Sequence, residues 1–229
     1  MIYVTGDTHG SFTRIIDFCK TQSTSREDIM IILGDAGINY SGGIDDEIKK
    51  KVLADVPITL FCIHGNHENR PENIVSYNET EFMGGSAYCE EKYPNLIFAR
   101  DGEIYLLDGK RTLVVGGAYS IDKAVRLVMS YKWWANEQPS EQTKKLVEYI
   151  LEQNQWKVDA VLTHTCPIKY EPKEAFVQSI SQSKVDNSTE YWLDLIEDKL
   201  TYSKWYCGHF HIYKVIDKLR FLFEDIVEF

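Results

Sequence analysis

The sequence lacks the cysteine pairs and long apolar runs that mark secreted or membrane-spanning proteins. Its five cysteines are an odd number without a Cys-x-x-Cys pair, so neither a zinc ribbon nor a complete disulfide framework is indicated. The first apolar run breaks at Gly6 and Asp7, too early for a signal peptide, and no run reaches the length of a membrane span. We therefore expect a cytoplasmic protein that does not contact a membrane.

Positive charge is scarce as well. The chain has 25 Lys and Arg against 35 Asp and Glu, which gives a formal net charge of -10. Proteins hold long nucleic acid through clustered Lys and Arg, so this balance argues against that kind of partner. The 229 residues, 44% of them hydrophobic, contain no internal repeat, linker or low-complexity segment. We expect one packed domain over residues 1–229.

What the sequence does contain is a motif repeated five times, an apolar run followed closely by polar side chains. The motifs are Met1–Val4 before Asp7 and His9, Ile29–Leu33 before Asp35, Pro57–Ile63 before Asn66 and His67, Ala160–Leu162 before His164, and Trp205–Cys207 before His209 and His211. Continuous apolar runs of this length are typical of buried strands in α/β proteins, which carry their sites at the carboxyl ends of the strands. We therefore expect these polar side chains to meet at one edge.

All six histidines lie in or beside these five strand ends. A single histidine is more often a core or surface residue with an ordinary hydrogen bond, but the joint pattern favours metal binding. Carboxylate, imidazole and amide ligands together suit Mn, Fe, Zn, Co or Ni better than Ca²⁺, which prefers oxygen, or Cu(I), which prefers sulfur. The sequence therefore predicts a transition-metal site.

Helical patterns separate the first three apolar runs, which predicts a β-α-β-α-β series with parallel strands. The first helix is expected to have its N-cap at Ser11, and the second to place Ile44, Ile48 and Val52 on one face. Between residues 97 and 115 the sequence predicts antiparallel strands and a hairpin turn.

Taken together, the motifs resemble the signature of the calcineurin-like metallophosphoesterases. In order, they are Asp7-x-His9, Gly34-Asp35, Gly65-Asn66-His67-Glu68, His164 and Gly208-His209-x-His211. The superfamily includes Ser/Thr protein phosphatases, purple acid phosphatases, cyclic-nucleotide phosphodiesterases and DNA-repair nucleases. The resemblance implies an α/β fold, a four-layer α/β/β/α sandwich of two mixed sheets, with a dinuclear metal site at the carboxyl ends of the strands. We expect residues 120–139 to form an ordered insertion, and the segment 119–140 also resembles bacterial and phage phosphoesterases of unassigned substrate.

The resemblance assigns seven side chains, by position, to two divalent metal ions that share one carboxylate. The first ion would take Asp7, His9, Asp35 and His211, and the second would take Asp35, Asn66, His164 and His209. Of the metals named above, Mn is favoured. Two such ions activate a hydroxide and clamp the attacking and leaving oxygens of a phosphoester, which makes Asp35 catalytic as well as a ligand. His67 would act at the leaving group as a general acid or a cationic stabiliser, whereas His64 has no ligand role in the family.

One motif departs from the family pattern. Most relatives continue the second motif with an Asp and an Arg, but this chain has Ile38 and Asn39 at those positions. The missing Asp commonly orients the histidine that corresponds to His67. The missing Arg removes a phosphate contact, which argues against the protein-phosphatase branch. Arg70 and Arg126 are the candidate substrate-binding replacements.

The favoured interpretation is a metal-dependent hydrolase of a small or flexible phosphoester, either a phosphomonoesterase or a phosphodiesterase, that uses a metal-activated hydroxide. One alternative is a non-catalytic metal-binding or scaffold relative of the fold, which the complete ligand set disfavours. A second alternative is a nuclease, which the acidic composition disfavours.

Overall fold

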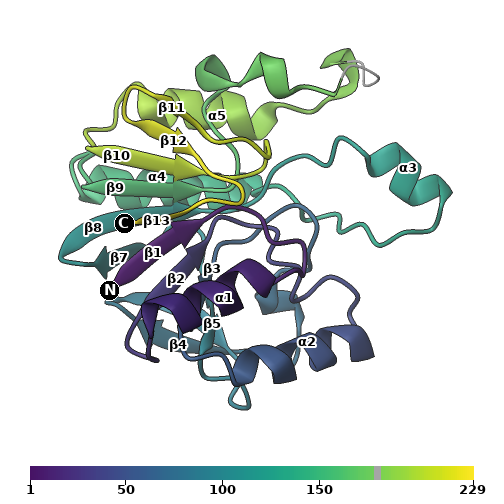
Figure 1. Ribbon diagram of the computed structural model, residues 1–229. Coiled ribbons are helices and arrows are strands. Elements are labelled where there is room, and N and C mark those ends of the chain that lie inside the picture. Colours follow the sequence, from purple (N-terminus) through teal and green to yellow (C-terminus); the bar gives the residue numbers. More distant parts are fainter. Residues whose placement is uncertain (178–181) are drawn as a thin grey trace.

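The computed structural model describes residues 1–177 and 182–229, and its buried strands form two mixed sheets (Figure 1). The strands of the first sheet are β1 (Ile2–Thr5), β2 (Ile29–Ile32), β3 (Thr59–Cys62), β4 (Asn78–Phe82), β5 (Gly85–Cys89), β6 (Leu96–Ala99) and β13 (Ile226–Glu228). They lie in the order β13-β1-β2-β3-β6-β5-β4. Strands β1, β2, β3 and β6 are parallel, whereas β13, β5 and β4 provide the antiparallel edges.

The second sheet has the same organisation, a parallel centre with antiparallel edges. Its strands are β7 (Ile104–Leu107), β8 (Lys110–Val115), β9 (Ala160–Thr163), β10 (Lys204–Cys207), β11 (Lys214–Ile216) and β12 (Leu219–Phe221). They lie in the order β11-β12-β10-β9-β8-β7, and the four central strands are parallel. The predicted combination of two mixed sheets is therefore confirmed.

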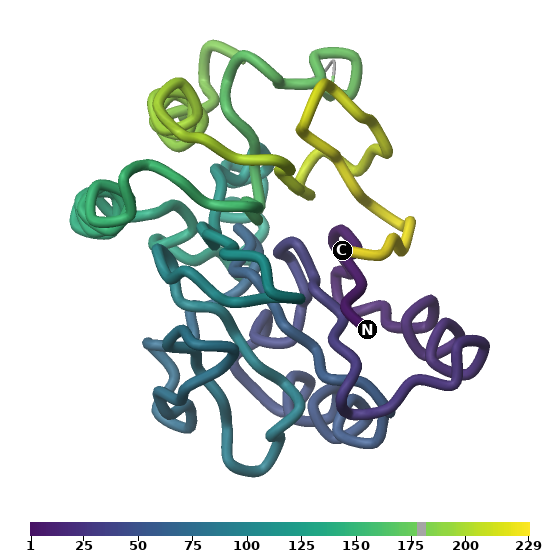
Figure 2. Tube along the Cα trace, turned by 90° about the vertical axis from the view of Figure 1, so that its left-hand side faces the viewer, coloured from purple at the N-terminus to yellow at the C-terminus, as the bar shows by residue number. Residues whose placement is uncertain are grey.

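Helices cover the outer face of each sheet. The helices are α1 (Thr13–Gln22), α2 (Ile44–Ala54), α3 (Lys123–Val128), α4 (Glu141–Gln153) and α5 (Ser188–Glu197), with short 3-10 turns at Pro71–Asn73, Ile168–Tyr170, Lys173–Ala175 and Gln182–Lys184. In Figure 2 the α4 and α5 coils lie on one side of the strands and the α1 coil lies on the other. Helix α3 projects from the body within the predicted insertion (Figure 1). None of the helices in the described part of the chain has the length and apolar character needed to cross a bilayer.

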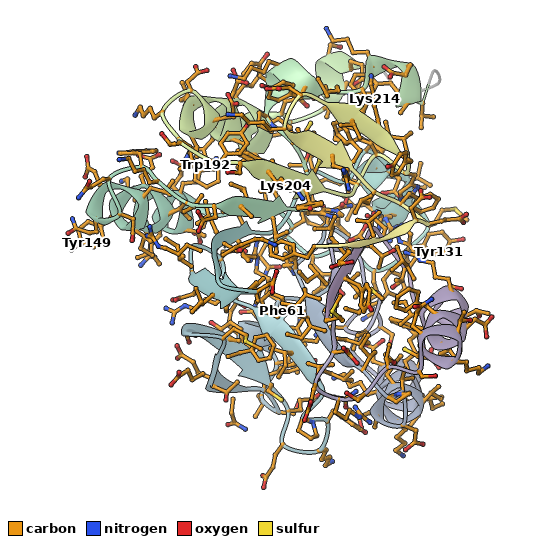
Figure 3. The ribbon with its side chains drawn as sticks, turned by 60° about the vertical axis from the view of Figure 1, so that its left-hand side comes forward. Phe61, Tyr131, Tyr149, Trp192, Lys204 and Lys214 are labelled. Atoms are coloured by element: carbon orange, nitrogen blue, oxygen red, sulfur yellow. The ribbon has the colours of Figure 1, made fainter. Side chains whose placement is uncertain are left out.

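Three apolar clusters hold these layers together. The central cluster lies between the sheets and includes Ile31 and Phe61. Figure 3 labels Phe61 in the interior of the molecule. A second cluster packs Met30 and its neighbours against α1 and α2, and a third packs Val147 and Trp192 against the other sheet. Because successive side chains of a strand point to opposite faces, Met30 and Ile31 serve different clusters. The four-layer α/β/β/α arrangement follows from this burial on both faces.

The expected pairing between residues 97 and 115 is only partly correct. Strands β7 and β8 form the antiparallel hairpin, and its turn residues Asp108 and Gly109 have φ values of 50° and 70°, in the left-handed region that suits a tight two-residue hairpin turn. Residues 97 and 98, however, belong to β6 in the other sheet. This strand pairs in parallel with β3 and antiparallel with β5. The local pattern identified the strand but not its partners.

The expected N-cap at Ser11 is wrong. Helix α1 begins at Thr13, and the backbone N–H of Ser11 donates instead to Thr8 O in the preceding turn. Along α2, Ile44, Ile48 and Val52 share one face, as predicted, and this face is 71%, 53% and 55% exposed at the three positions.

Polar contacts decide which face of α2 is buried. Asp46 accepts hydrogen bonds from the backbone N–H groups of Ser41 and Gly42, and Lys50 Nζ lies 2.6 Å from Glu90 Oε2 in a buried ion pair. Both side chains are almost fully buried, together with Leu53. The buried face of α2 therefore carries paired charges, and its apolar face is the exposed one.

Candidate metal centre

The five predicted motifs lie at the carboxyl ends of β1, β2, β3, β9 and β10. Strands β1, β2 and β3 are neighbours in the first sheet, as are β9 and β10 in the second. The arrowheads of β1, β9 and β10 point towards the side from which α3 projects (Figure 1). Since the two sheets pack face to face, these ends bring residues more than 200 positions apart into contact, as the contact between His9 and His211 shows.

Asp7, His9 and His211 form the first group of potential ligands. His9 Nε2 lies 2.9 Å from His211 Nε2, and Asp7 Oδ2 lies 3.3 Å from His211 Nε2 and 3.7 Å from His9 Nε2. Asp7 Oδ2 is buried and accepts no hydrogen bond from the described residues. One carboxylate oxygen and two ring nitrogens therefore face the same point, as a divalent cation requires.

His164, Asn66 and Asp35 form the second group. His164 Nδ1 lies 2.7 Å from Leu33 O, and because a carbonyl only accepts, this contact places the proton on Nδ1. Asn66 Nδ2 donates to Ser120 Oγ at 2.9 Å, which turns Asn66 Oδ1 towards His164. His164 Nε2 then faces Asn66 Oδ1 at 2.8 Å. An imidazole nitrogen and an amide oxygen held this close fit a shared cation, so these residues suit the metal that the motifs predict.

Asp35 connects the two groups. Its Oδ1 accepts a hydrogen bond from the backbone N–H of His67 at 2.8 Å. Its Oδ2 lies 3.8 Å from Nε2 of His67, 3.8 Å from Nε2 of His164 and 3.9 Å from Nδ1 of His9. The side chain thus has one oxygen fixed by the backbone and the other facing both groups, which is the position of a bridging ligand.

Strained backbone positions four of the seven predicted ligands. His9, Asp35, His209 and His211 have φ values of 47°, 46°, 66° and 52°. Left-handed conformations cost non-glycine residues on the order of 1 kcal/mol or more and are concentrated at functional sites. At Gly65, a Cβ atom would lie 2.0 Å from Asp35 Oδ1, so only glycine permits this approach.

The charges of the centre depend on its tight packing. Burial alone would raise the pKa of Asp7, but His164, His211 and His9 together hold it well below its usual value. The close Asp7 carboxylate, whose Oδ2 lies 3.3 Å from His211 Nε2, raises the pKa of His211, whereas burial and the neighbouring His164 lower the pKa of His209. Asp7 is therefore ionised and His209 is neutral, which are the forms that bind metal ions.

Glu68 ties the second and third motifs together, a role that the sequence did not indicate. The side chain is fully buried, and its oxygens accept hydrogen bonds from the backbone N–H groups of Gly65 and Gly37 at 3.3 and 3.2 Å. Burial and the nearby Asp35 raise the pKa of Glu68 to about 8. This carboxyl group fixes the two loops that carry Asp35 and Asn66.

The departure from the family pattern has a structural explanation. Ile38 is buried in the cluster under α1 and α2, and Asn39 Oδ1 accepts a hydrogen bond from Tyr77 at 3.0 Å. Neither position turns towards the metal groups. The backbone N–H of His67 donates to Asp35 Oδ1, and its ring Nε2 lies 3.8 Å from Asp35 Oδ2. Burial lowers the pKa of His67 against the attraction of Asp35.

Two pockets flank the centre, and Asp35 and His67 line both. The smaller, which we call the basic pocket, has a volume of about 230 Å³ and includes Lys49 and Arg126. Lys49 Nζ donates to Gly37 O at 2.6 Å. The sequence analysis did not single out Lys49, because only the fold turns this α2 side chain back over the second motif.

The larger, which we call the acidic pocket, has a volume of about 550 Å³. Its carboxylates are Asp122, Glu171 and Glu190, and its apolar walls include Phe176 and Phe210. No Lys or Arg is among its described lining residues. The two pockets therefore give opposite electrostatic surroundings to the two sides of the centre.

The structure does not bring Arg70 to the metal centre. Its Nη1 lies 2.5 Å from Asp101 Oδ2 in a buried ion pair, and its Nε donates to Asn136 O at 2.9 Å. Arg70 and His64 line a separate cavity. Arg126, in contrast, lines the basic pocket, where Nε pairs with Asp122 at 2.8 Å. Of the two arginines predicted from sequence, only Arg126 lies beside the centre.

Comparison with known proteins agrees with this geometry. No curated protein sequence matches the chain. The family model described as calcineurin-like phosphoesterase matches residues 1–213, which include all the motifs of the centre. The chain therefore belongs to the calcineurin-like phosphoesterase family, whose members are metal-dependent hydrolases of phosphoesters.

Proposed function

We propose that the protein hydrolyses a small phosphoester at a centre that holds two divalent metal ions. The observation that carries this proposal is the convergence of metal-ligating atoms, with Asp7 Oδ2 buried and unpaired in the first group and His164 Nε2 facing Asn66 Oδ1 in the second. Asp35 lies between the groups and would belong to both. Carboxylate, imidazole and amide ligands together suit a divalent transition metal.

The ligands would divide as the motifs predict. The first ion would bind Asp7, His9, Asp35 and His211, and the second Asp35, Asn66, His164 and His209. Mn is the favoured metal. When bound, the ions would supply Lewis-acid activation of water and neutralise the charge of the phosphoryl oxygens.

The residues around the centre would orient the substrate. In the basic pocket, Arg126 and Lys49 would bind the phosphoryl oxygens, which supplies the positive charge that Asn39 does not. His67 lines both pockets and would donate a proton to the leaving oxygen, because a general acid has to reach the atom that departs. The leaving group would occupy the acidic pocket, whose volume of about 550 Å³ suits a small organic group.

A substrate comparison with Mn tests this function. The purified protein is assayed on a phosphomonoester, a phosphodiester, a cyclic nucleotide and a phosphopeptide, with and without a chelator. We expect chelator-sensitive hydrolysis of at least one of the small esters and weaker action on the phosphopeptide. A folded, metal-loaded protein without activity on any ester contradicts the proposal and supports the scaffold alternative. Salt-sensitive cleavage of polynucleotides supports the nuclease alternative instead.

A further inference from the structure

A third cavity, with a volume of about 220 Å³, shares no lining residue with the two pockets of the metal centre. Its walls come from segments that are distant in the sequence. They include His64 and Arg70, at the two ends of the loop after β3, Arg100 and Asp101 after β6, and Ser140 and Gln142 at the start of α4.

Two of these side chains carry buried polar atoms without a partner. His64 is 3% exposed, and neither of its ring nitrogens has a hydrogen-bond partner among the described residues. Arg70 is 8% exposed, and its Nη2 also lacks an acceptor. A buried donor left unpaired costs about 1–3 kcal/mol, so such groups normally indicate a bound molecule or ordered water.

The first turn of α4 adds further donors. This helix of 13 residues begins after Ser140, whose side chain accepts a hydrogen bond from the backbone N–H of Thr143. The other N–H groups of a first helical turn have no intrahelical acceptor and carry the positive end of the helix dipole. Gln142, in this turn, lines the cavity. A helix start of this kind is a favourable place for an anion.

The acidic groups at the cavity are already paired or open to solvent. Asp101 Oδ2 is held by Arg70 Nη1 at 2.5 Å, and Asp101 Oδ1 accepts from the backbone N–H of Gly116 at 2.7 Å. Glu72 is exposed at the mouth, and Arg100 pairs with Glu79 outside the lining. The unpaired side-chain groups of the buried lining residues are therefore mainly donors: Arg70 Nη2 and a ring N–H of His64.

We propose that this cavity binds a small oxyanion, at a site separate from the metal centre. Phosphate, sulfate and a simple carboxylate share the chemistry that Arg70, His64 and the start of α4 would recognise. A volume of about 220 Å³ holds such an ion with a few waters, since each water occupies about 30 Å³, and it is smaller than most pockets for drug-sized ligands.

Binding here would act on the loop that carries metal-centre residues. His64 and Arg70 are the two ends of a segment that contains Asn66, His67 and Glu68. The same segment is held to the end of β8, in the second sheet, by the hydrogen bond from the backbone N–H of Gly117 to His64 O at 2.8 Å. An ion that bridges His64 and Arg70 would fix both ends of the segment.

The proposal can be tested by NMR of the Zn-loaded protein with ¹⁵N-labelled histidine. The six histidines give few signals, and the ring signals of His64 are assigned by their loss in His64→Gln. Inorganic phosphate, sulfate and acetate are titrated separately at constant ionic strength. We expect a saturable shift of the His64 signals with at least one of them. A stronger response to phosphate and sulfate identifies a tetrahedral oxyanion, and a stronger response to acetate identifies a carboxylate.

Two substitutions at one position give the matched control. Gln142→Glu places a negative charge at the cavity and suits the first turn of a helix, so it should fold. It should weaken binding at least tenfold, whereas Gln142→Met, which adds no charge, should retain it. His64 signals that no anion moves, or that shift without saturation and equally in Gln142→Glu, overturn the proposal.

Discussion

The basic and acidic pockets share Asp35 and His67 but differ in both size and charge. The basic pocket, about 230 Å³, presents Lys49 and Arg126, whereas the acidic pocket, about 550 Å³, presents carboxylates and apolar rings. A phosphoryl group carries negative charge on its oxygens and therefore suits the basic pocket. The acidic pocket has no Lys or Arg among its described lining residues and would suit an uncharged organic group. The difference indicates the direction in which a substrate would lie across the centre.

One ion pair forms the boundary between the two pockets. Asp122 lines the acidic pocket and Arg126 the basic pocket, and they are bound to each other at 2.8 Å. Arg126 lies in α3 and Asp122 precedes it, so the insertion that projects from the body in Figure 1 supplies a wall to each pocket. The segment with no clear pattern in the sequence therefore has a defined place at the site.

The largest effect is expected where the two pockets meet. Asp35→Asn removes the charge that both ligand groups share, so it should lower the rate by roughly 10³-fold or more and reduce the metal content. Turnover and elemental analysis of the same preparation measure both. If the variant keeps its metal and most of its rate, Asp35 does not bridge two ions.

The next largest loss of rate is expected for His67, on the side of the centre where the leaving group would lie. His67→Ala should lower the rate on an alkyl ester by roughly 10²- to 10⁴-fold while metal content stays intact, because the leaving alkoxide needs a proton. A nitrophenyl ester needs little protonation, so much of the loss should disappear with it. An equal loss on both esters rules out the general acid, and no loss on either removes His67 from the mechanism.

The basic pocket is tested by a smaller change. Lys49→Met removes one cation beside the phosphoryl position and should lower kcat/KM by about 10- to 100-fold, the usual effect of one charged hydrogen bond. Lys51→Met, at an exposed position of the same helix, is the matched control and should change little. Similar losses in the two variants would show that only overall charge matters.

The buried carboxyl group of Glu190 in the acidic pocket is best tested through the pH dependence of thermal stability. Burial raises the pKa of Glu190, which is 4% exposed, from 4.5 to about 7. The folded chain then holds a proton that the unfolded chain releases, so stability is lost as the pH rises from 4.5 through 7. Glu190→Gln should remove this loss, worth at most on the order of 3 kcal/mol, and raise Tm more at pH 8 than at pH 5.

The control for that experiment is Glu152→Gln, at an exposed position of α4. It should leave Tm nearly unchanged at both pH values. If Glu190→Gln has the same effect on Tm at pH 5 and pH 8, the carboxyl group is not protonated in the folded protein.

The buried parallel strands were the most predictable part of the fold. Strands such as β2 are apolar on both faces, so they appear in the sequence as continuous runs, and their ends identify the metal-centre residues. The hairpin of β4 and β5 was not predicted, because β4 is largely polar and exposed. Strand β13 is only three residues long and depends on its pairing with β1. Its sequence alone gives no signal.

Positions decided by tertiary contacts could not be read from the sequence. The buried face of α2 depends on ion pairs such as that of Lys50 with Glu90, 40 residues away. Arg70 and Arg126 were equivalent candidates in the sequence, but the fold directs Arg70 to Asp101 and Arg126 to the basic pocket. Motif spacing predicts the candidate metal ligands, whereas the placement of the side chains around them depends on packing.

The most direct test of the account is to titrate the metal-free protein with Mn and to follow bound metal and phosphoester hydrolysis together. The account predicts two ions per chain, with full activity only when the second is bound, because the ligands form two groups that share Asp35. Binding that stays below one ion per chain, with no gain in activity with either Mn or Zn, would contradict the dinuclear centre.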